Sequence, residues 1–225
     1  MKRSEINTRI ASAIEFFKIM HFQLPPFAYF SPGEWQKNSA AAREIFELKL
    51  GWDITDFGEG DFEKTGLILF TLRNGLPGSK EFTKPYAEKI MIVDINQKTP
   101  LHFHWQKTED IINRGGGDLV FELYNSTAGE DLDYSQISIQ ISGFSQKMDP
   151  AKKLILKPGE WLTLPPRVYH TFYGQESKVL VGEVSSVNDD MSDNRFYEPI
   201  GRFPEIEEDE TPKYLLCTEY PGIIP

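Results

Sequence analysis

From about Gly66 to Ser186, short apolar or alternating runs follow one another, with turn-forming residues between them. Runs of roughly four to eight residues with this pattern are typical of β-strands. The predicted strands are GLILFTL, YAEKIMIV, PLHFHW, DLVFELY, ISIQISG, KLILK, EWLTLP, YHTFYG and KVLVGEVS, and the predicted turns are RNGLPGSK, NRGGGD, NSTAGEDLD and KPGE. Because no helical segment interrupts the strands, we expect an all-β antiparallel barrel of the jelly-roll type.

The residues before this region have a helical pattern instead. Apolar residues recur at helical spacing at Ile6, Ile10, Ile14 and Phe17. Ser4 is the candidate N-cap of this first helix. A second helix is predicted to begin at Ser31, where SPGE has the capping-box pattern, and to end at Gly51. We therefore expect an N-terminal helical extension that packs on the barrel.

The chain has no linker that would divide it into independent domains. After Ser186 the strand pattern fades into a polar, acidic segment that contains proline. We predict a single domain over residues 1–225, with a helical region at 1–52, a barrel core at 66–186 and a C-terminal segment at 187–225 that covers or flanks the functional site.

Charge and composition limit the class of partner. The formal net charge is −10, so we expect no binding to nucleic acid or to an anionic membrane surface. The N-terminus alternates charged and apolar residues, which fits neither a signal peptide nor a membrane span. The single cysteine, Cys217, fits a reducing compartment. These features favour a cytoplasmic protein that acts on a neutral small molecule or binds a metal cation.

Two of the four histidines stand one residue apart. If PLHFHW is a strand, His102 and His104 project from the same face. Glu109 follows closely and offers a carboxylate, and His170 is the best candidate for a fourth group because His21 lies at the end of the first helix. Imidazole and carboxylate together bind divalent metals, although such histidines can also be ordinary core or surface residues.

Two segments around these residues resemble the paired motifs of the cupin superfamily, whose small antiparallel barrel holds a metal ion in its mouth. The matching positions are His102, His104, Glu109 and Gly116 in the first motif and Gly159, Pro165 and His170 in the second. Departures occur at Asn96, Arg167 and Gly174, and none removes a ligand. The resemblance implies one divalent metal held by His102, His104, Glu109 and His170. Mn, Zn, Fe, Co and Ni all suit this ligand set.

A closer resemblance covers nearly the whole chain. The segments that carry it are LHFHWQKTEDIINRGGG, LPPRVYHTFYG, VGEVSSVNDDMSDN, RFYEPIGRF and FTLRNG. They are similar to the bacterial D-lyxose isomerase family, which interconverts D-lyxose with D-xylulose and, in many members, D-mannose with D-fructose. That family uses a divalent metal, usually Mn. The resemblance implies an aldose–ketose isomerase with a sugar substrate, and a homodimeric assembly.

An aldose–ketose isomerisation moves a hydrogen between carbons 1 and 2, so it needs acid and base groups beside the metal. Lys89 alternates with Ala87 and Met91 and faces either the barrel interior or the surface, and the resemblance favours the interior. Glu198 is either an acid or base delivered by the C-terminal segment or an exposed loop residue. Lys89 and Glu198 are the predicted catalytic residues, and the residues alone leave proton transfer and hydride shift both open.

Five further residues are predicted to bind the substrate. They are Trp105, Phe172, Glu183, Asp189 and Asp190. The two aromatic residues flank the ligands and would either stack on the sugar or pack in the core. The paired aspartates would accept hydrogen bonds from hydroxyl groups or form a turn. Glu183, which alternates with apolar or small residues, would face the metal or lie outside the barrel.

Two other classes of function stay open on the sequence. A cupin dioxygenase would use the same four ligands, with an oxygen-reactive metal and a largely apolar pocket. A sugar-binding or storage cupin would hold the metal only as a structural ion. Lys89 and Glu198 pointing away from the cavity would favour this second alternative.

Overall fold

A computed structural model describes residues 1–222 of the chain, and within this range a single twelve-stranded sheet forms the barrel. Its strands run in the order β1 (Gly51–Thr55), β2 (Leu67–Arg73), β3 (Tyr86–Val93), β11 (Val168–Ser186), β5 (Glu109–Ser126), β10 (Trp161–Leu164), β7 (Ile137–Ile141) and β8 (Phe144–Met148). Four short strands join this path: β4 (His102–Phe103) beside β11, β12 (Arg195–Phe196) beside β4, and both β6 (Leu132–Asp133) and β9 (Leu154–Leu156) beside β5. The strands of the sheet pair antiparallel, as the turn pattern predicts.

The two longest strands, β5 and β11, pair along almost their full lengths, from Glu109 opposite Ser185 to Asn125 opposite Val168. Here the predicted turn NRGGGD is wrong, because it lies inside β5. A Cβ on Gly116 would collide with the main chain of β11, and its φ of +98° suits glycine. These glycines let the paired strands bend as one ribbon, with a register shift in β11 at the same level. The predicted strands YHTFYG and KVLVGEVS are likewise one strand, β11.

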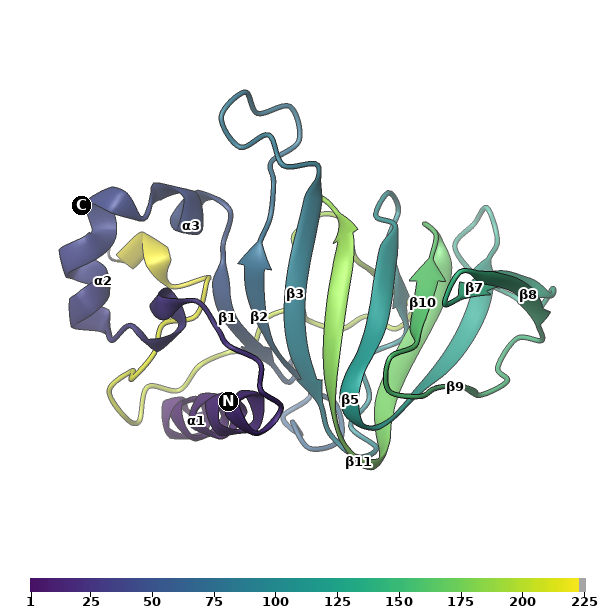
Figure 1. Ribbon diagram of the computed structural model, residues 1–225, viewed down its shortest axis with the longest axis horizontal. Coiled ribbons are helices and arrows are strands. Elements are labelled where there is room, and N and C mark those ends of the chain that lie inside the picture. The colour runs from purple at the N-terminus through teal and green to yellow at the C-terminus, as the bar shows by residue number, and fades with distance from the viewer. Residues whose placement is uncertain (223–225) are drawn as a thin grey trace.

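The helices gather at the β1 end of the sheet, and the β7–β8 hairpin lies at the opposite end (Figure 1). They are α1 (Arg3–Ile19), α2 (Pro32–Asn38) and α3 (Arg43–Glu47), with 3-10 turns η1 (Pro26–Tyr29), η2 (Ser39–Ala41) and η3 (Tyr220–Gly222). None of the helices in residues 1–222 is long and apolar enough to cross a lipid bilayer.

Two predicted helix boundaries differ from the structure. Ser4 lies in the first turn of α1 and donates to Asp209 through its hydroxyl, 2.7 Å away, so it is not the N-cap. The second predicted helix is interrupted and ends at Glu47, and Gly51 with a φ of +115° begins β1 instead of ending a helix. The strand that follows is only five residues long and adjoins the helical region, which hid it in the pattern.

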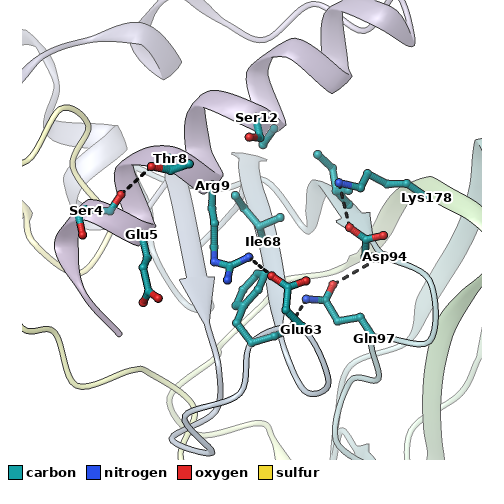
Figure 2. Close-up of a pocket in the computed structure, with 13 residues that line it drawn as sticks. Ser4, Glu5, Thr8, Arg9, Ser12, Glu63, Ile68, Asp94, Gln97 and Lys178 are labelled. Atoms are coloured by element: carbon teal, nitrogen blue, oxygen red, sulfur yellow. Dashed lines mark hydrogen bonds and ion pairs between the residues drawn. The ribbon is translucent and has the colours of Figure 1, made fainter.

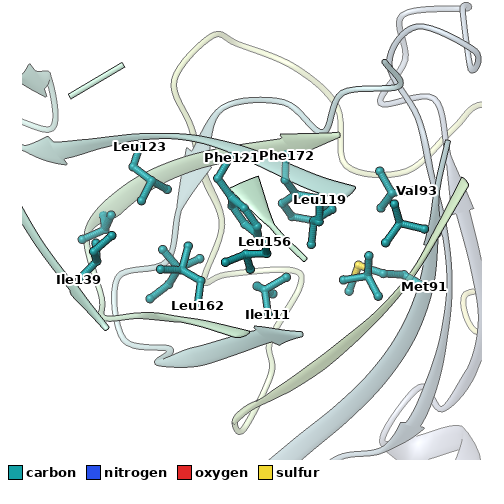
Figure 3. Close-up of a cluster of buried hydrophobic side chains, with 14 of the residues drawn as sticks. Met91, Val93, Ile111, Leu119, Phe121, Leu123, Ile139, Leu156, Leu162 and Phe172 are labelled. Atoms are coloured by element: carbon teal, nitrogen blue, oxygen red, sulfur yellow. The ribbon is translucent and has the colours of Figure 1, made fainter. Parts of the chain in front are cut away.

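Apolar residues are buried on both faces of the sheet. The outer cluster packs α1 against the sheet through Ile6, Ile10, Phe17, Ile54, Ile68, Phe70, Ile90, Ile92 and Leu180, among others. The inner cluster fills the barrel with Leu119, Phe121, Leu123, Ile139, Leu156, Leu162 and their neighbours (Figure 3). Because side chains alternate along a strand, β2 and β3 supply both clusters. This all-β barrel with a helical extension confirms the predicted fold class.

The N-terminus is joined to the C-terminal segment by polar contacts, and in one of them the Arg3 side chain is buried. The Arg3 side chain is 0% exposed and pairs with Glu208 at 2.6 Å and also with Glu219. The Met1 ammonium donates to the main-chain oxygen of Glu205 at 2.7 Å. The C-terminal segment is therefore anchored to the start of α1 as well as to the barrel.

Candidate active site

The three predicted histidine ligands meet in one place. β4 pairs with β11 so that His102 lies opposite His170, and their ring centroids are 4.2 Å apart. His104 follows directly after β4, 5.7 Å from His170 between ring centroids. One ring nitrogen of each of the three histidines lies within 4.8 Å of the others, a spacing that could hold a metal ion.

Each imidazole is oriented by a main-chain carbonyl that its Nδ1 contacts. His102 Nδ1 lies 2.8 Å from the oxygen of Pro100, and His170 Nδ1 lies 3.0 Å from that of Val168. His104 Nδ1 lies 2.6 Å from the oxygen of Asp193. Since a carbonyl oxygen only accepts, each Nδ1 carries the proton, and each Nε2 keeps the lone pair that a metal needs.

Glu109, the fourth predicted ligand, lies beside two of the histidines. Its Oε1 is 3.4 Å from His104 Nε2 and 3.2 Å from His170 Nε2, and the side chain is 2% exposed. Among the described residues this buried oxygen has no hydrogen-bond partner. An acceptor oxygen packed against two acceptor nitrogens is unfavourable unless a cation lies between them, so these residues fit a divalent metal.

Burial and nearby charges set the protonation of this group. Burial alone would raise the pKa of Glu109, but the neighbouring Lys107 ammonium holds that pKa well below its usual range. Burial holds the pKa of His102 well below its usual range. A carboxylate and neutral imidazoles are the protonation states that metal binding requires.

A network of charged side chains adjoins the histidines. Lys107 Nζ lies 2.8 Å from Glu109 Oε2 and 3.0 Å from Glu183 Oε1. Lys89 Nζ lies 3.6 Å from the same oxygen of Glu183 and 3.5 Å from Asp190. Burial alone would lower the pKa of Lys107, but the carboxylates of Glu109, Glu183 and Asp190 raise it overall, so Lys107 is an ammonium. The network thus carries a proton donor and a carboxylate next to each other.

The strand registers explain why these side chains share one face. Glu183 on β11 lies opposite Lys89 on β3, and Ser185 lies opposite Glu109 on β5. Directly paired residues of neighbouring strands project to the same side of a sheet. Of the two positions that the sequence leaves open for Lys89, the structure selects the interior, where its side chain is 3% exposed.

The cavity between these groups is small, about 50 Å³. Polar residues in its wall are Lys89, Thr99, His102, His104, Lys107, Glu109, His170, Glu183, Asp190, Asn194 and Arg202, and apolar ones are Phe57, Leu67, Leu69, Met91, Ile111, Phe172 and Phe196. Asp190, Asn194, Phe196 and Arg202 come from the C-terminal segment, which therefore forms a portion of the wall. A wall with this many charged and hydrogen-bonding groups suits a polyhydroxylated substrate.

The structure brings four of the predicted catalytic and substrate-binding residues to this cavity: Lys89, Phe172, Glu183 and Asp190. The other three lie elsewhere. Trp105 donates from Nε1 to Glu130 at 2.7 Å, and Asp189 accepts from the main chain of Met191 at 2.9 Å within its own turn. Glu198 is exposed and does not line the cavity, so a catalytic role for it stays a prediction without support from its position.

Lys107 and Arg202 are the main functional candidates that the sequence did not reveal. Lys107 precedes β5 and belongs to no strand, so strand alternation does not predict the direction of its side chain. Arg202 has no such signal either, because it reaches the cavity from a loop and pairs with Asp53 and Asp190. Its Nη1 is buried and has no partner among the described residues.

A larger cavity, of about 560 Å³, lies between α1 and the outer face of the sheet (Figure 2). Arg9 stacks on the Phe62 ring at 4.0 Å and pairs with Glu63 at 2.8 Å, and Lys178 pairs with Asp94 at 2.9 Å. Its cations Arg9 and Lys178 are thus engaged with carboxylates, and none of the described residues in its wall is a histidine or cysteine. Of these two cavities, the smaller is the candidate active site, because the three histidines, Glu109 and the buried lysines line it.

An antiparallel barrel with three convergent imidazoles and a buried carboxylate defines a cupin with a candidate metal centre. Comparison with known proteins places it more narrowly. The family model for D-lyxose isomerase matches residues 1–220. The chain is 50% identical over 223 residues to a D-lyxose/D-mannose isomerase from Serratia proteamaculans, and 51% identical over 223 residues to one from Escherichia coli O157:H7; each match covers 98% of both chains.

Among solved structures, the L-ribose isomerase from Acinetobacter sp. DL28 in complex with L-ribose has the same fold. The TM-score is 0.59 at 15% identity, covering 91% of this chain and 98% of that one. The chain belongs to the D-lyxose isomerase family, which confirms the resemblance seen in its sequence. It is an aldose–ketose isomerase.

Proposed function

We propose that this isomerase depends on a divalent metal and interconverts D-lyxose with D-xylulose, and D-mannose with D-fructose. The observation that carries the metal dependence is Glu109 Oε1, a buried oxygen that lies against two imidazole nitrogens and has no hydrogen-bond partner among the described residues. The relatives named D-lyxose/D-mannose isomerase, about half identical over nearly their whole length, support the two sugar pairs.

His102, His104, His170 and Glu109 would hold the metal. When bound, such an ion polarises a carbonyl and orients two neighbouring oxygens of the substrate. We propose Mn as the physiological metal, because a mixed set of imidazole and carboxylate ligands suits it, with Zn, Fe, Co and Ni as the alternatives.

Glu183 is the proposed base that takes a proton from carbon 2 and returns it to carbon 1. It lines the cavity, is buried, and accepts a hydrogen bond from Lys107. Lys107 and Lys89 would place positive charge beside the substrate oxygens, and Lys107 is ionised because the surrounding carboxylates raise its pKa. This role moves Glu183 from the predicted substrate contacts to the reacting carbons.

The far side of the cavity would bind the remaining hydroxyl groups. Asp190 offers acceptor oxygens, and Arg202 offers the donor Nη1, which has no partner among the described residues. A buried donor without a partner costs about 1–3 kcal/mol, which a substrate hydroxyl would recover. The charged wall is also the opposite of the apolar pocket that a cupin dioxygenase would need.

Assembly and location belong to the same proposal. The strand β8 is exposed and lies at one end of the strand order beside β7, so its other edge would be covered by another protein surface, which supports a homodimer. The single cysteine among 225 residues supports a cytoplasmic location.

The test is metal removal followed by restoration. The protein is stripped with a chelator, supplied with one metal at a time, and assayed for ketose formation from D-lyxose and from D-mannose. We expect the stripped protein to be inactive and Mn to restore the highest rate on both sugars. Full activity after removal of all metal would refute the metal dependence, and turnover of neither sugar with any metal would refute the substrates.

A further inference from the structure

The C-terminal segment follows the metal-binding strand closely. β12 pairs with β4, so that Phe196 lies opposite His102 and Arg195 opposite Phe103. Beyond this pair, the Tyr197 N–H donates to the main-chain oxygen of Leu101 at 2.9 Å. Residues 193–197 therefore lie along the chain that carries His102 and His104.

One residue of this segment, Asp193, makes three hydrogen bonds to the metal-binding loop. Its main-chain oxygen accepts from His104 Nδ1 at 2.6 Å. Its two carboxylate oxygens accept from the N–H groups of Gln106 and Lys107, each at 3.0 Å. The side chain itself does not reach the cavity wall, so it has no direct role in the chemistry.

We propose that Asp193 is a positioning residue that couples metal binding to closure of residues 188–197 over the cavity. This inference rests on the proposed metal dependence. Asp193 fixes His104 directly. It fixes Glu109 indirectly, because it holds the main chain of Lys107, whose ammonium binds Glu109 Oε2 at 2.8 Å.

The hydrogen bonds from Asp193 help to fix the loop of residues 104–108, because this loop is outside the strand ladders. Residues 104–108 belong to no strand, so the N–H groups of Gln106 and Lys107 have no ladder partners. A carboxylate that accepts two N–H groups is a strong, charge-assisted contact. Removing a contact of this kind, which orients a metal ligand, typically lowers the metal affinity about 10-fold to 100-fold.

This segment also closes one side of the cavity. Asp190, Asn194 and Phe196 form part of the wall, which encloses only about 50 Å³. Displacement of residues 188–197 would open the cavity to substrate and would break the bond between Asp193 and His104. By linkage, a metal that favours the closed arrangement of His104 also favours the closed segment.

The experiment compares Asp193→Asn with the wild type. Asparagine keeps the shape, but one N–H of the loop then faces an amide donor instead of an acceptor. The Kd for Mn²⁺, measured by equilibrium dialysis without substrate, is expected to rise about 10-fold to 100-fold. Hydrogen exchange of residues 188–197 should slow on Mn²⁺ binding in the wild type and much less in the variant. Saturating Mn²⁺ should restore most of the lost kcat.

Asp118→Asn is the matched control, because it removes a carboxylate oxygen that pairs with Lys157 elsewhere on β5. It should leave the Kd for Mn²⁺ unchanged even if it lowers the Tm. An Asp193→Asn protein that binds Mn²⁺ as tightly as the wild type, with the same exchange response, would overturn the inference and leave the proposed function standing. A wild type that binds no divalent metal would overturn both.

Discussion

The barrel interior has an apolar half and a polar half, and the strands β5 and β11 contribute side chains to both. In one half, β5 and β11 contribute to a cluster of aliphatic and aromatic side chains (Figure 3). In the other, they supply Glu109, His170 and Glu183, which meet two buried lysines. Apolar packing stabilises the first half by itself. Charges in the second are tolerated only because each is paired, so that half depends on a complete network.

The strongest test of this difference removes one ligand from the polar half. Glu109→Ala should lower metal affinity by more than about 100-fold, since losing a ligand costs more than losing the contacts around it. Asp110→Ala is the matched control, because Asp110 projects from the other face of β5 and accepts from Thr163 at 2.5 Å. Metal content after dialysis measures both. Equal retention in the two variants would exclude Glu109 as a ligand.

A smaller loss is expected when the metal stays and the base is removed. Glu183→Gln should lower kcat by about 1,000-fold and keep the metal, since a positioned acid or base typically contributes about 10²-fold to 10⁴-fold. Glu198→Gln, the same change at an exposed site, should keep kcat within about threefold of wild type. If the two effects were reversed, Glu198 would be the catalytic residue that the sequence predicts.

The apolar half should respond in stability and not in chemistry. Leu156 is 0% exposed in the inner cluster, and Leu156→Ala should cost about 3 kcal/mol of unfolding free energy by leaving a cavity. Urea unfolding measures this loss, and the Kd for Mn²⁺ of the folded variant should be unchanged. A large rise in that Kd would show that the two halves are not independent.

The smallest expected effect is a dependence of stability on pH at Asp190. Burial would raise the pKa of this carboxyl, but Lys89, Arg202 and Lys107 hold it well below its usual range. Its contribution to stability is therefore present above the unfolded pKa of about 3.9 and is lost as pH falls through the lower folded pKa. The Tm gap between wild type and Asp190→Asn should narrow between pH 6 and pH 3. A gap that stays constant would exclude this charge effect.

The polar half was partly predictable, because local spacing carries some of its pattern. His102 and His104 share a face at i and i+2, Glu109 follows closely, and the cupin motifs support these three together with His170 as one ligand set. Asp193 and Arg202 could not be found in this way. They reach the site from an irregular segment, where no periodicity indicates which way a side chain points.

In the apolar half, the sequence predicted the regular strands but not the bend between them. Its strands were predicted because alternation reveals a buried face, but the bend that joins the two halves was not. Gly115, Gly116 and Gly117 look like a turn between strands, since glycine favours both turns and close approach of two chains. Only the tertiary pairing of β5 with β11 distinguishes these two uses.

That long β5–β11 pairing also has a consequence for how the chain folds. Paired residues on the two strands are separated by more than forty residues of chain, so most of the ladder consists of contacts distant in sequence. Such high contact order slows folding, because loop closure is costly before the contacts form. Glu109 and His170 belong to opposite ends of the ladder and come within 3.2 Å only once it is complete and bent. The ion site would therefore form late, and adding metal at the start of refolding should not accelerate the main folding step.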